Sequence, residues 1–239
     1  MSWLDDTRPS AILFDLDGVL TPTAEVHRRA WSDLFTPVLE AAGVAPYTEA
    51  DYYDHIDGKP RYDGVRDMLA SRGIVLPEGD PSDAPDAETV CGLGNRKDAS
   101  FTAILHSEGI TPYPASVRFL DAVTERGVKV AIVSSSKNAR AVLDAAGLLS
   151  RFAVIVDGRV AADERLPGKP APDMFQRAAT LLDVPNDVAV VVEDALSGVR
   201  AGAAGGFAAV VGVDRGTGAE RLTEAGADVV VRELDELVN

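Results

Sequence analysis

Short runs of consecutive apolar residues alternate with amphipathic segments along much of the chain. Apolar runs without polar alternation are typical of strands that are buried on both faces of a parallel sheet. The runs that predict strands are Ala11–Phe14, 128–133, 152–156, 188–192, 208–213 and 228–231. Helical patterns lie between the later runs, at 116–126, 139–146, 172–182 and 198–204. The alternation predicts right-handed βαβ units, and therefore an α/β fold with a Rossmann-like parallel sheet.

The stretch from residue 23 to residue 107 has a different pattern. It is largely helical and begins with 25–39, whose apolar stripe has helical spacing: Val26, Ala30, Leu34 and Val38. A polar, proline-rich loop at 78–85 interrupts it. We expect a helical cap domain, 23–107, inserted into a core formed by 1–22 and 108–239. The connecting strips would be 21–23 and 109–112.

Charge and cysteine content limit the classes of partner. The chain of 239 residues carries 38 acidic and 23 basic side chains, a formal net charge of −15, without a dense basic cluster. It should repel nucleic acid and anionic membranes, so an anionic small substrate needs a few placed cations or a metal. The single cysteine, Cys91, allows no intrachain disulfide, residues 1–6 lack the pattern of a signal peptide, and no apolar run has membrane-spanning length. We expect a cytoplasmic monomer.

Two carboxylates follow the first apolar run directly. Asp15 and Asp17 are spaced i, i+2 at the end of a predicted buried strand, and Gly18 then permits a sharp turn. Adjacent buried acids repel and lose hydration, which favours a cation between them. Taken alone, the five residues 15–19 are explained equally well by an ordinary strand-to-loop junction.

Three more polar motifs follow predicted strands or precede helices. Ser134–Asn138, which reads Ser-Ser-Ser-Lys-Asn, ends one strand and opens a helix, as a phosphate site or a simple N-cap would. Lys169 is held between Gly168 and Pro170, and Glu193-Asp194 ends the most apolar strand. Ligands of open α/β sheets bind at the carboxyl ends of the strands. The four motifs together therefore predict one oxygen-rich site suited to Mg²⁺ and a phosphate group.

This ordered set resembles the haloacid dehalogenase superfamily of phosphotransferases. The resemblance implies that Asp15 attacks phosphorus to form an aspartyl phosphate, and that Asp17 is the general acid/base. It implies that Ser134 and Lys169 hold the transferring phosphoryl group. The implied Mg²⁺ ligands are Asp15, the Asp17 backbone carbonyl, Glu193 and Asp194. Such chemistry fits phosphoryl transfer, which depends mainly on alignment and charge neutralisation.

The segment after the first motif is similar to that of the β-phosphoglucomutase family. In that resemblance His27 helps to orient the acid/base, Arg61 grips the distal phosphate and Lys97 is a further active-site cation. The loop residues Ser135, Ser136, Lys137 and Asn138 match a phosphate-contacting loop. Without the family, His27, Arg61 and Lys97 would be interpreted as solvated residues. The chain departs from the family pattern at Pro22, at Lys59-Pro60 and in the 78–85 insertion.

The implied function is a Mg²⁺-dependent mutase that interconverts β-D-glucose 1-phosphate and D-glucose 6-phosphate. The intermediate would be glucose 1,6-bisphosphate, and the enzyme would be a transient phosphoprotein of carbohydrate metabolism. A sugar-phosphate phosphatase, a hydrolase with the same core, is the alternative. Dehalogenases lack the second aspartate, and a non-catalytic module would have lost Asp15 or Asp17; this chain retains both.

Overall fold

The computed structural model describes residues 3–238, which form two compact units. Of these, residues 3–22 and 110–238 make up the sheet unit, and Thr23–Gly109 make up the helical unit. The chain leaves the sheet unit after Pro22 and returns to it at Ile110. The return comes two residues later than the sequence boundary of 107/108, because α5 (Val90–Glu108) continues to Glu108.

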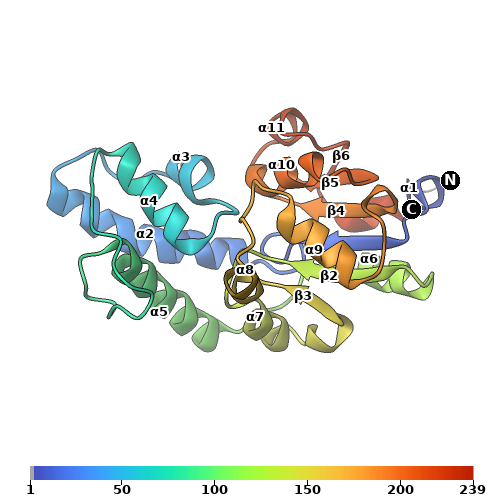
Figure 1. Ribbon diagram of the computed structural model, residues 1–239, viewed down its shortest axis with the longest axis horizontal. Helices are drawn as coiled ribbons and strands as arrows, with labels where there is room; N and C mark the ends of the chain where they lie inside the picture. The colour runs from blue at the N-terminus through green and yellow to red at the C-terminus, as the bar shows by residue number, and fades with distance from the viewer. Residues whose placement is uncertain (1–2, 239) are drawn as a thin grey trace. The chain divides into compact units, whose positions relative to one another are not determined.

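The sheet unit is built on six parallel strands in the order β3-β2-β1-β4-β5-β6 (Figure 1). Their bounds are β1 Ala11–Phe14, β2 Lys129–Val133, β3 Val154–Val156, β4 Ala189–Glu193, β5 Ala209–Val213 and β6 Val229–Val231. Each predicted strand is present, within two residues of its expected start. The predicted α/β fold with a parallel sheet is confirmed.

Helices cover the strands because the central strands have no polar face. All residues of β1, β4 and β5 are buried. The helices of this unit are α1 Trp3–Thr7, α6 Pro114–Glu125, α7 Ala139–Ala145, α8 Gly158–Glu164, α9 Asp173–Leu181, α10 Leu196–Ala204 and α11 Ala219–Glu224. Leu13 packs on one face with Phe175 of α9 and Val199 of α10. Phe14 points to the other face, where its ring meets that of Phe119 of α6.

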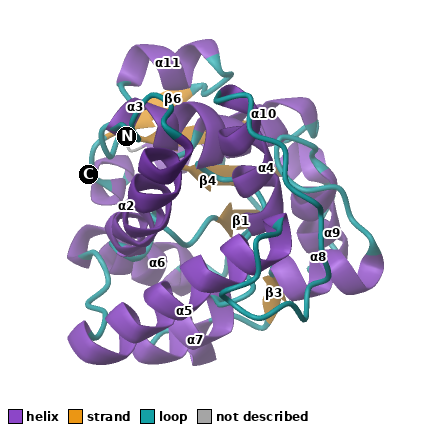
Figure 2. Cartoon of the chain, turned by 90° about the vertical axis from the view of Figure 1, so that its left-hand side faces the viewer, coloured by secondary structure: helices purple, strands orange, loops and turns teal. Residues whose placement is uncertain are grey.

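The helical unit, whose helices α2, α4 and α5 are labelled in Figure 2, has its own apolar core. Its elements are α2 Thr23–Ala42, α3 Glu49–Asp51, the π-helical turn Tyr52–Ile56, α4 Arg61–Ser71 and α5. In α2 the buried apolar positions are Ala30, Trp31, Leu34, Phe35 and Leu39. Ala30 and Leu34 of the expected stripe are therefore buried, whereas Val26 and Val38 are half-buried. Among the described residues, no helix combines the length and the apolar character needed to cross a bilayer.

Candidate active site

Register in the sheet brings three of the polar motifs to one edge. Phe14 of β1 pairs with Ile132 of β2 and with Val192 of β4. The next residue, Asp15, donates its backbone N–H to the Val192 carbonyl at 2.9 Å. Asp15 therefore lies between the ends of β2 and β4, which lead into Ser134 and Glu193. The convergence expected from strand order alone is what the register produces.

Lys169 joins two of these motifs from a loop between α8 and α9. Its ammonium lies 2.6 Å from Asp15 Oδ1 and also contacts Glu193 Oε1 and the Val133 carbonyl, at 2.9 Å. The lysine is 2% exposed. A buried ammonium needs such partners, since desolvating an unpaired charge costs several kcal/mol. Its pKa is raised: burial lowers it, but Asp15 and Glu193 more than offset that effect.

Asp15, Glu193 and Asp194 form a buried acidic cluster at this edge. One carboxylate oxygen from each lies within 4.8 Å of the others. With the Lys169 ammonium, the four groups carry a formal surplus of two negative charges. All-oxygen donors with that surplus fit a hard divalent cation. Burial, opposed by Lys169 and reinforced by Glu193 and Asp17, raises the pKa of Asp15 well above its usual value.

Local packing fixes the Glu193 carboxylate. Its Oε2 accepts hydrogen bonds from the backbone N–H groups of Asp194 and Ala195, both at 3.1 Å. A Cβ at Gly198, in the first turns of α10, would lie 1.8 Å from Glu193 Oε1. Glycine at 198 therefore makes room for the carboxylate, and the acid is held in one place before any ligand binds.

Asp17 and Gly18 form a tight turn after β1. Asp17 is half-buried and makes an isolated bridge with Thr21, while Gly18 donates its N–H to the Thr21 carbonyl at 2.8 Å. Gly18 has φ +83°, and a Cβ there would lie 1.8 Å from Asp194 Oδ2. Both facts require glycine. Asp17 is close enough to raise the pKa of Asp15, although its carboxylate is outside the three-residue cluster.

Residues Ser134–Asn138 form a loop between β2 and α7 that is stabilised by hydrogen bonds among its own residues. Ser134 is buried, and its Oγ accepts from the Ser136 N–H at 3.1 Å; Ser136 Oγ accepts from the Asn138 N–H at the same distance. Ser135, Lys137 and Asn138 are half-buried. These hydroxyls and amides are the donor types that bind phosphate oxygens. The geometry is that of a compact polar loop beside Asp15.

In the helical unit, His27 of α2 and Lys97 of α5 are in direct contact. The Lys97 ammonium meets His27 Nδ1, and it also lies 5.0 Å from the centre of the Trp31 ring and 4.7 Å from that of Phe101. The His27 ring stacks on Phe101 at 4.1 Å. Lys97 is buried and His27 half-buried, so the solvated alternative is wrong for both. Aromatic faces stabilise this cation through their π-electrons.

Arg61 begins α4 and is held by α5. Its Nη2 lies 2.6 Å from Asp98 Oδ1, and its Nη1 donates to Asn95 Oδ1 at 3.4 Å. Asn95 in turn donates to the carbonyls of Pro81 and Asp83, in the 78–85 insertion. The insertion is thus joined to the arginine through one side chain. Arg61, too, is half-buried and paired, where the sequence alone favoured a solvated side chain.

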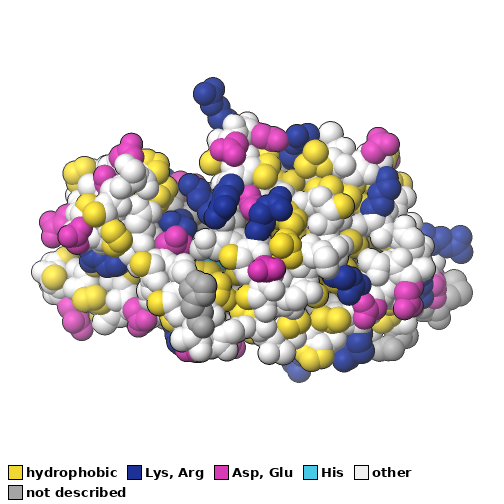
Figure 3. All heavy atoms as spheres, turned by 90° about the horizontal axis from the view of Figure 1, so that it is seen from below, with side chains coloured by type: hydrophobic (Ala, Val, Ile, Leu, Met, Phe, Trp, Pro, Cys, Tyr) yellow, Lys and Arg dark blue, Asp and Glu magenta, His cyan; other side chains and the backbone are white. Residues whose placement is uncertain are grey.

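Sequence reasoning missed three participants. The contact of the Val133 carbonyl with Lys169 could not be predicted, because a backbone carbonyl is present at every residue. Gly198 lies in a predicted helix, where the sequence gives no sign that it contacts Glu193. Arg215 follows β5 and donates to the Gly18 carbonyl. Its position just after a strand end was the available signal, because the motifs at Asp15, Ser134 and Glu193 were found that way. On the face of the molecule drawn in Figure 3, acidic and basic side chains are interspersed.

Comparison with known proteins places the chain among phosphate-handling enzymes. A haloacid dehalogenase-like hydrolase family model matches residues 9–206. A β-phosphoglucomutase of Mycobacterium bovis is 50% identical, over 95% of this chain and 91% of its own length; one of Bacillus subtilis is 32% identical over the same shares.

Solved structures of related proteins have the same fold. The β-phosphoglucomutase of Clostridium difficile has a TM-score of 0.77 at 25% identity, covering 96% of this chain and 93% of that one. CbbY of Rhodobacter sphaeroides, in complex with xylulose-(1,5)bisphosphate, has a TM-score of 0.73 at 27% identity, covering 96% of each chain. The chain therefore belongs to the haloacid dehalogenase-like hydrolases, within their β-phosphoglucomutase-like group.

Proposed function

We propose that this protein is a Mg²⁺-dependent β-phosphoglucomutase that interconverts β-D-glucose 1-phosphate and D-glucose 6-phosphate. The observation that carries the proposal is the buried contact of Lys169 with Asp15 and Glu193, beside Asp194, at the carboxyl edge of a parallel sheet. The names of the relatives, with 50% identity over nearly the whole chain, support the choice of reaction.

In the first step, a carboxylate oxygen of Asp15 forms a bond to phosphorus of glucose 1,6-bisphosphate, and the bond from phosphorus to the sugar oxygen breaks. Asp17 gives its proton to that departing oxygen. In the second step, a hydroxyl of the other glucose monophosphate passes its proton to Asp17 and attacks phosphorus, which restores Asp15. The carboxylate nucleophile divides the transfer into two in-line steps.

Lys169, Ser134 and the loop 135–138 would hold the phosphoryl oxygens as charge moves onto them. Asp15, Glu193 and Asp194, with the Asp17 backbone carbonyl, would hold the ion. Bound Mg²⁺ would neutralise their surplus charge and keep Asp15 ionised, against the raised pKa that burial gives it. The buried oxygen donors support a divalent cation, and the hard-ligand set favours Mg²⁺.

A mutase needs a second phosphate site that a phosphatase does not need. Each phosphate group of the bisphosphate must face Asp15 in turn, while the other one is held at a distance from it. We assign the distal grip to Arg61, whose planar guanidinium suits bidentate phosphate binding. His27 would orient Asp17, and Lys97, in contact with His27, would supply a further positive charge. The 23–109 unit would thus act as the cap on the 1–22 and 110–239 phosphotransferase core.

The alternative is a sugar-phosphate phosphatase, since the matching family model is named a hydrolase. One experiment separates the two: β-glucose 1-phosphate, Mg²⁺ and a trace of glucose 1,6-bisphosphate are supplied, and glucose 6-phosphate and free phosphate are both measured. A mutase forms glucose 6-phosphate with little phosphate release. Accumulation of phosphate without the isomer would reject the mutase, and Asp15→Asn is the control for contaminating activity.

Other sugar phosphates belong in the same assay. CbbY, which resembles this chain, was solved with a five-carbon sugar bisphosphate, so pentulose phosphates should be compared with glucose phosphates. Our proposal includes a monomer, and it places the protein in the cytoplasm, where a single buried cysteine without a disulfide is usual.

A further inference from the structure

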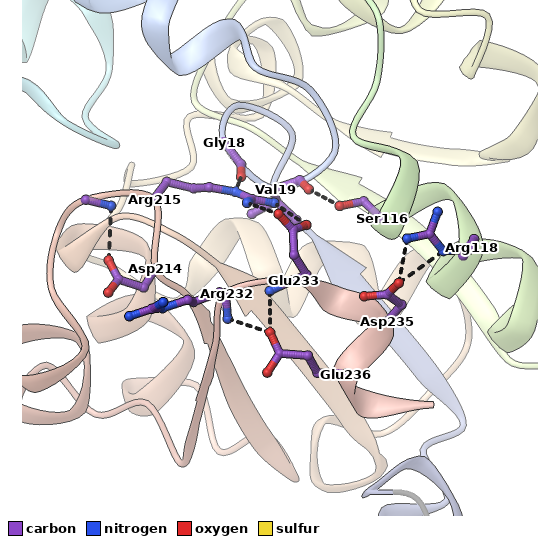
Figure 4. Close-up of polar contacts among 11 residues, drawn as sticks. Gly18, Val19, Ser116, Arg118, Asp214, Arg215, Arg232, Glu233, Asp235 and Glu236 are labelled. Atoms are coloured by element: carbon purple, nitrogen blue, oxygen red, sulfur yellow. Dashed lines mark hydrogen bonds and ion pairs between the residues drawn. The ribbon is translucent and has the colours of Figure 1, made fainter. Parts of the chain in front are cut away.

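Arg215 is the one charged side chain in Figure 4 that reaches the turn after β1. It lies in the loop between β5 and α11, and its Nε donates to the Gly18 carbonyl at 3.0 Å. That carbonyl belongs to the residue directly after Asp17. The arginine thus bonds to the backbone of the turn that carries the proposed acid/base.

The guanidinium is itself firmly held. Nη1 and Nη2 contact the two carboxylate oxygens of Glu233 at 2.9 and 3.2 Å, a bidentate pair. Its Cζ atom lies over the Tyr113 ring, 4.0 Å from the ring centre, and Tyr113 donates its N–H to the Leu20 carbonyl at 2.9 Å. The Arg215 side chain is 17% exposed. A side chain with so many fixed partners places its remaining N–H accurately.

Gly18 is also confined by Asp194. The space for a Cβ is filled by the Asp194 carboxylate, as described above. The Arg215 loop also holds Asp194, since Thr217 Oγ1 donates to the Asp194 carbonyl at 3.2 Å. Asp214 Oδ1 accepts from the N–H groups of Gly216 and Gly218, both at 3.0 Å, which stabilises the loop. One loop therefore fixes both the Asp17 turn and the Asp194 backbone.

We propose that Arg215 is a positioning residue that holds the Asp17 turn in register with the acidic cluster, so that Asp17 can protonate the departing sugar oxygen. The inference rests on the proposed function, in which Asp17 is the acid/base. A general acid must lie within hydrogen-bond reach of its oxygen, and a displacement of about 1 Å can cost about a hundredfold in rate.

The consequence is specific to the leaving group. A sugar alkoxide leaves poorly without a proton, whereas p-nitrophenolate leaves readily without one. Loss of Arg215 should therefore slow phosphoryl transfer from a sugar bisphosphate far more than transfer from p-nitrophenyl phosphate. A merely structural role would slow both reactions alike.

The test measures single-turnover phosphoenzyme formation from each donor by rapid quench, with saturating Mg²⁺. For Arg215→Gln we expect about a 30-fold loss with glucose 1,6-bisphosphate and less than about a 3-fold loss with p-nitrophenyl phosphate. Arg215→Lys should show the same unequal loss in weaker form and carries the test if Arg215→Gln does not fold.

Arg118→Gln is the matched control. Arg118, on α6, is 61% exposed and pairs with Asp235, in the same C-terminal turn as Glu233, and Figure 4 shows both ion pairs. Its loss should leave both rates within about twofold. Equal losses from the two donors, or no loss, in the Arg215 variants would overturn the inference while leaving the mutase intact. If the wild-type protein accepted phosphate from neither donor, the proposed function itself would fail, and the inference with it.

Discussion

The Lys169 ammonium and the Asp15 carboxylate lie 2.6 Å apart, although 154 positions separate them in the chain. Because Glu193 shares the same ammonium, removal of Lys169 leaves neighbouring buried carboxylates without their cation. We expect Lys169→Met to lose about 3–5 kcal/mol of unfolding free energy in chelator, with partial recovery in Mg²⁺. Thermal unfolding with and without the ion checks this, with the exposed Lys129→Met as control. Equal stability of both variants in chelator would show that the contact does not matter.

Gly18 offers a test of the turn itself. An alanine there would adopt a left-handed conformation and would push against the Asp194 carboxylate. Gly43 has a similar φ, +65°, with nothing within 4 Å of the Cβ position, so Gly43→Ala carries the conformational cost of about 1–2 kcal/mol alone. We expect Gly18→Ala, but not Gly43→Ala, to lose stabilisation by Mg²⁺. The shift in melting temperature with added Mg²⁺ measures the difference, and a normal shift in Gly18→Ala would count against it.

The sequence was most informative about features that depend on residues close together in the chain. The apolar runs located the strands, and since parallel strands end at one edge, their polar ends located Asp15, Ser134 and Glu193. Burial of His27 and Lys97 could not be read in the same way, because each depends on aromatic rings of other helical turns. The role of Arg215 depends on a backbone carbonyl 197 positions away, for which no residue type gives a signal.

Asp98 should compete with substrate for Arg61. The two are paired at 2.6 Å, so a phosphate that binds Arg61 must displace or share this contact. We expect Asp98→Asn to lower the concentration of glucose 1,6-bisphosphate needed for half-maximal activation by about 3- to 10-fold, within the worth of one charged hydrogen bond. Arg61→Ala should raise it. The control is Asp67→Asn: Asp67 lies on α4 with Arg61, and its ion pair with Lys59 does not involve Arg61. Identical behaviour of the two aspartate variants would remove the assignment.

Asp51 makes the helical unit sensitive to acid. Burial raises its pKa, but hydrogen bonds from Arg72 and Thr48 more than offset this, and the pKa is lowered overall. A lowered folded-state pKa stabilises the native protein above the unfolded value of about 3.9, and this contribution is lost as the pH falls through the folded pKa.

Asp51→Asn should therefore cost about 1.5–3 kcal/mol at pH 7, and the deficit should shrink in acid. Urea unfolding from neutral pH down to the acid limit of the native state, beside the exposed Asp33→Asn, follows this change. A deficit that stays constant with pH would contradict the ionic role of Asp51.

The site of phosphorylation tests the whole account most directly. After brief reaction with glucose 1,6-bisphosphate and Mg²⁺, acid quench and proteolysis, mass spectrometry should find one phosphoryl group on the peptide that contains Asp15. Borohydride should then convert residue 15 to homoserine, and Asp15→Asn should abolish the label. Label on another residue, or turnover by Asp15→Asn with no trapped intermediate, would contradict the central claim.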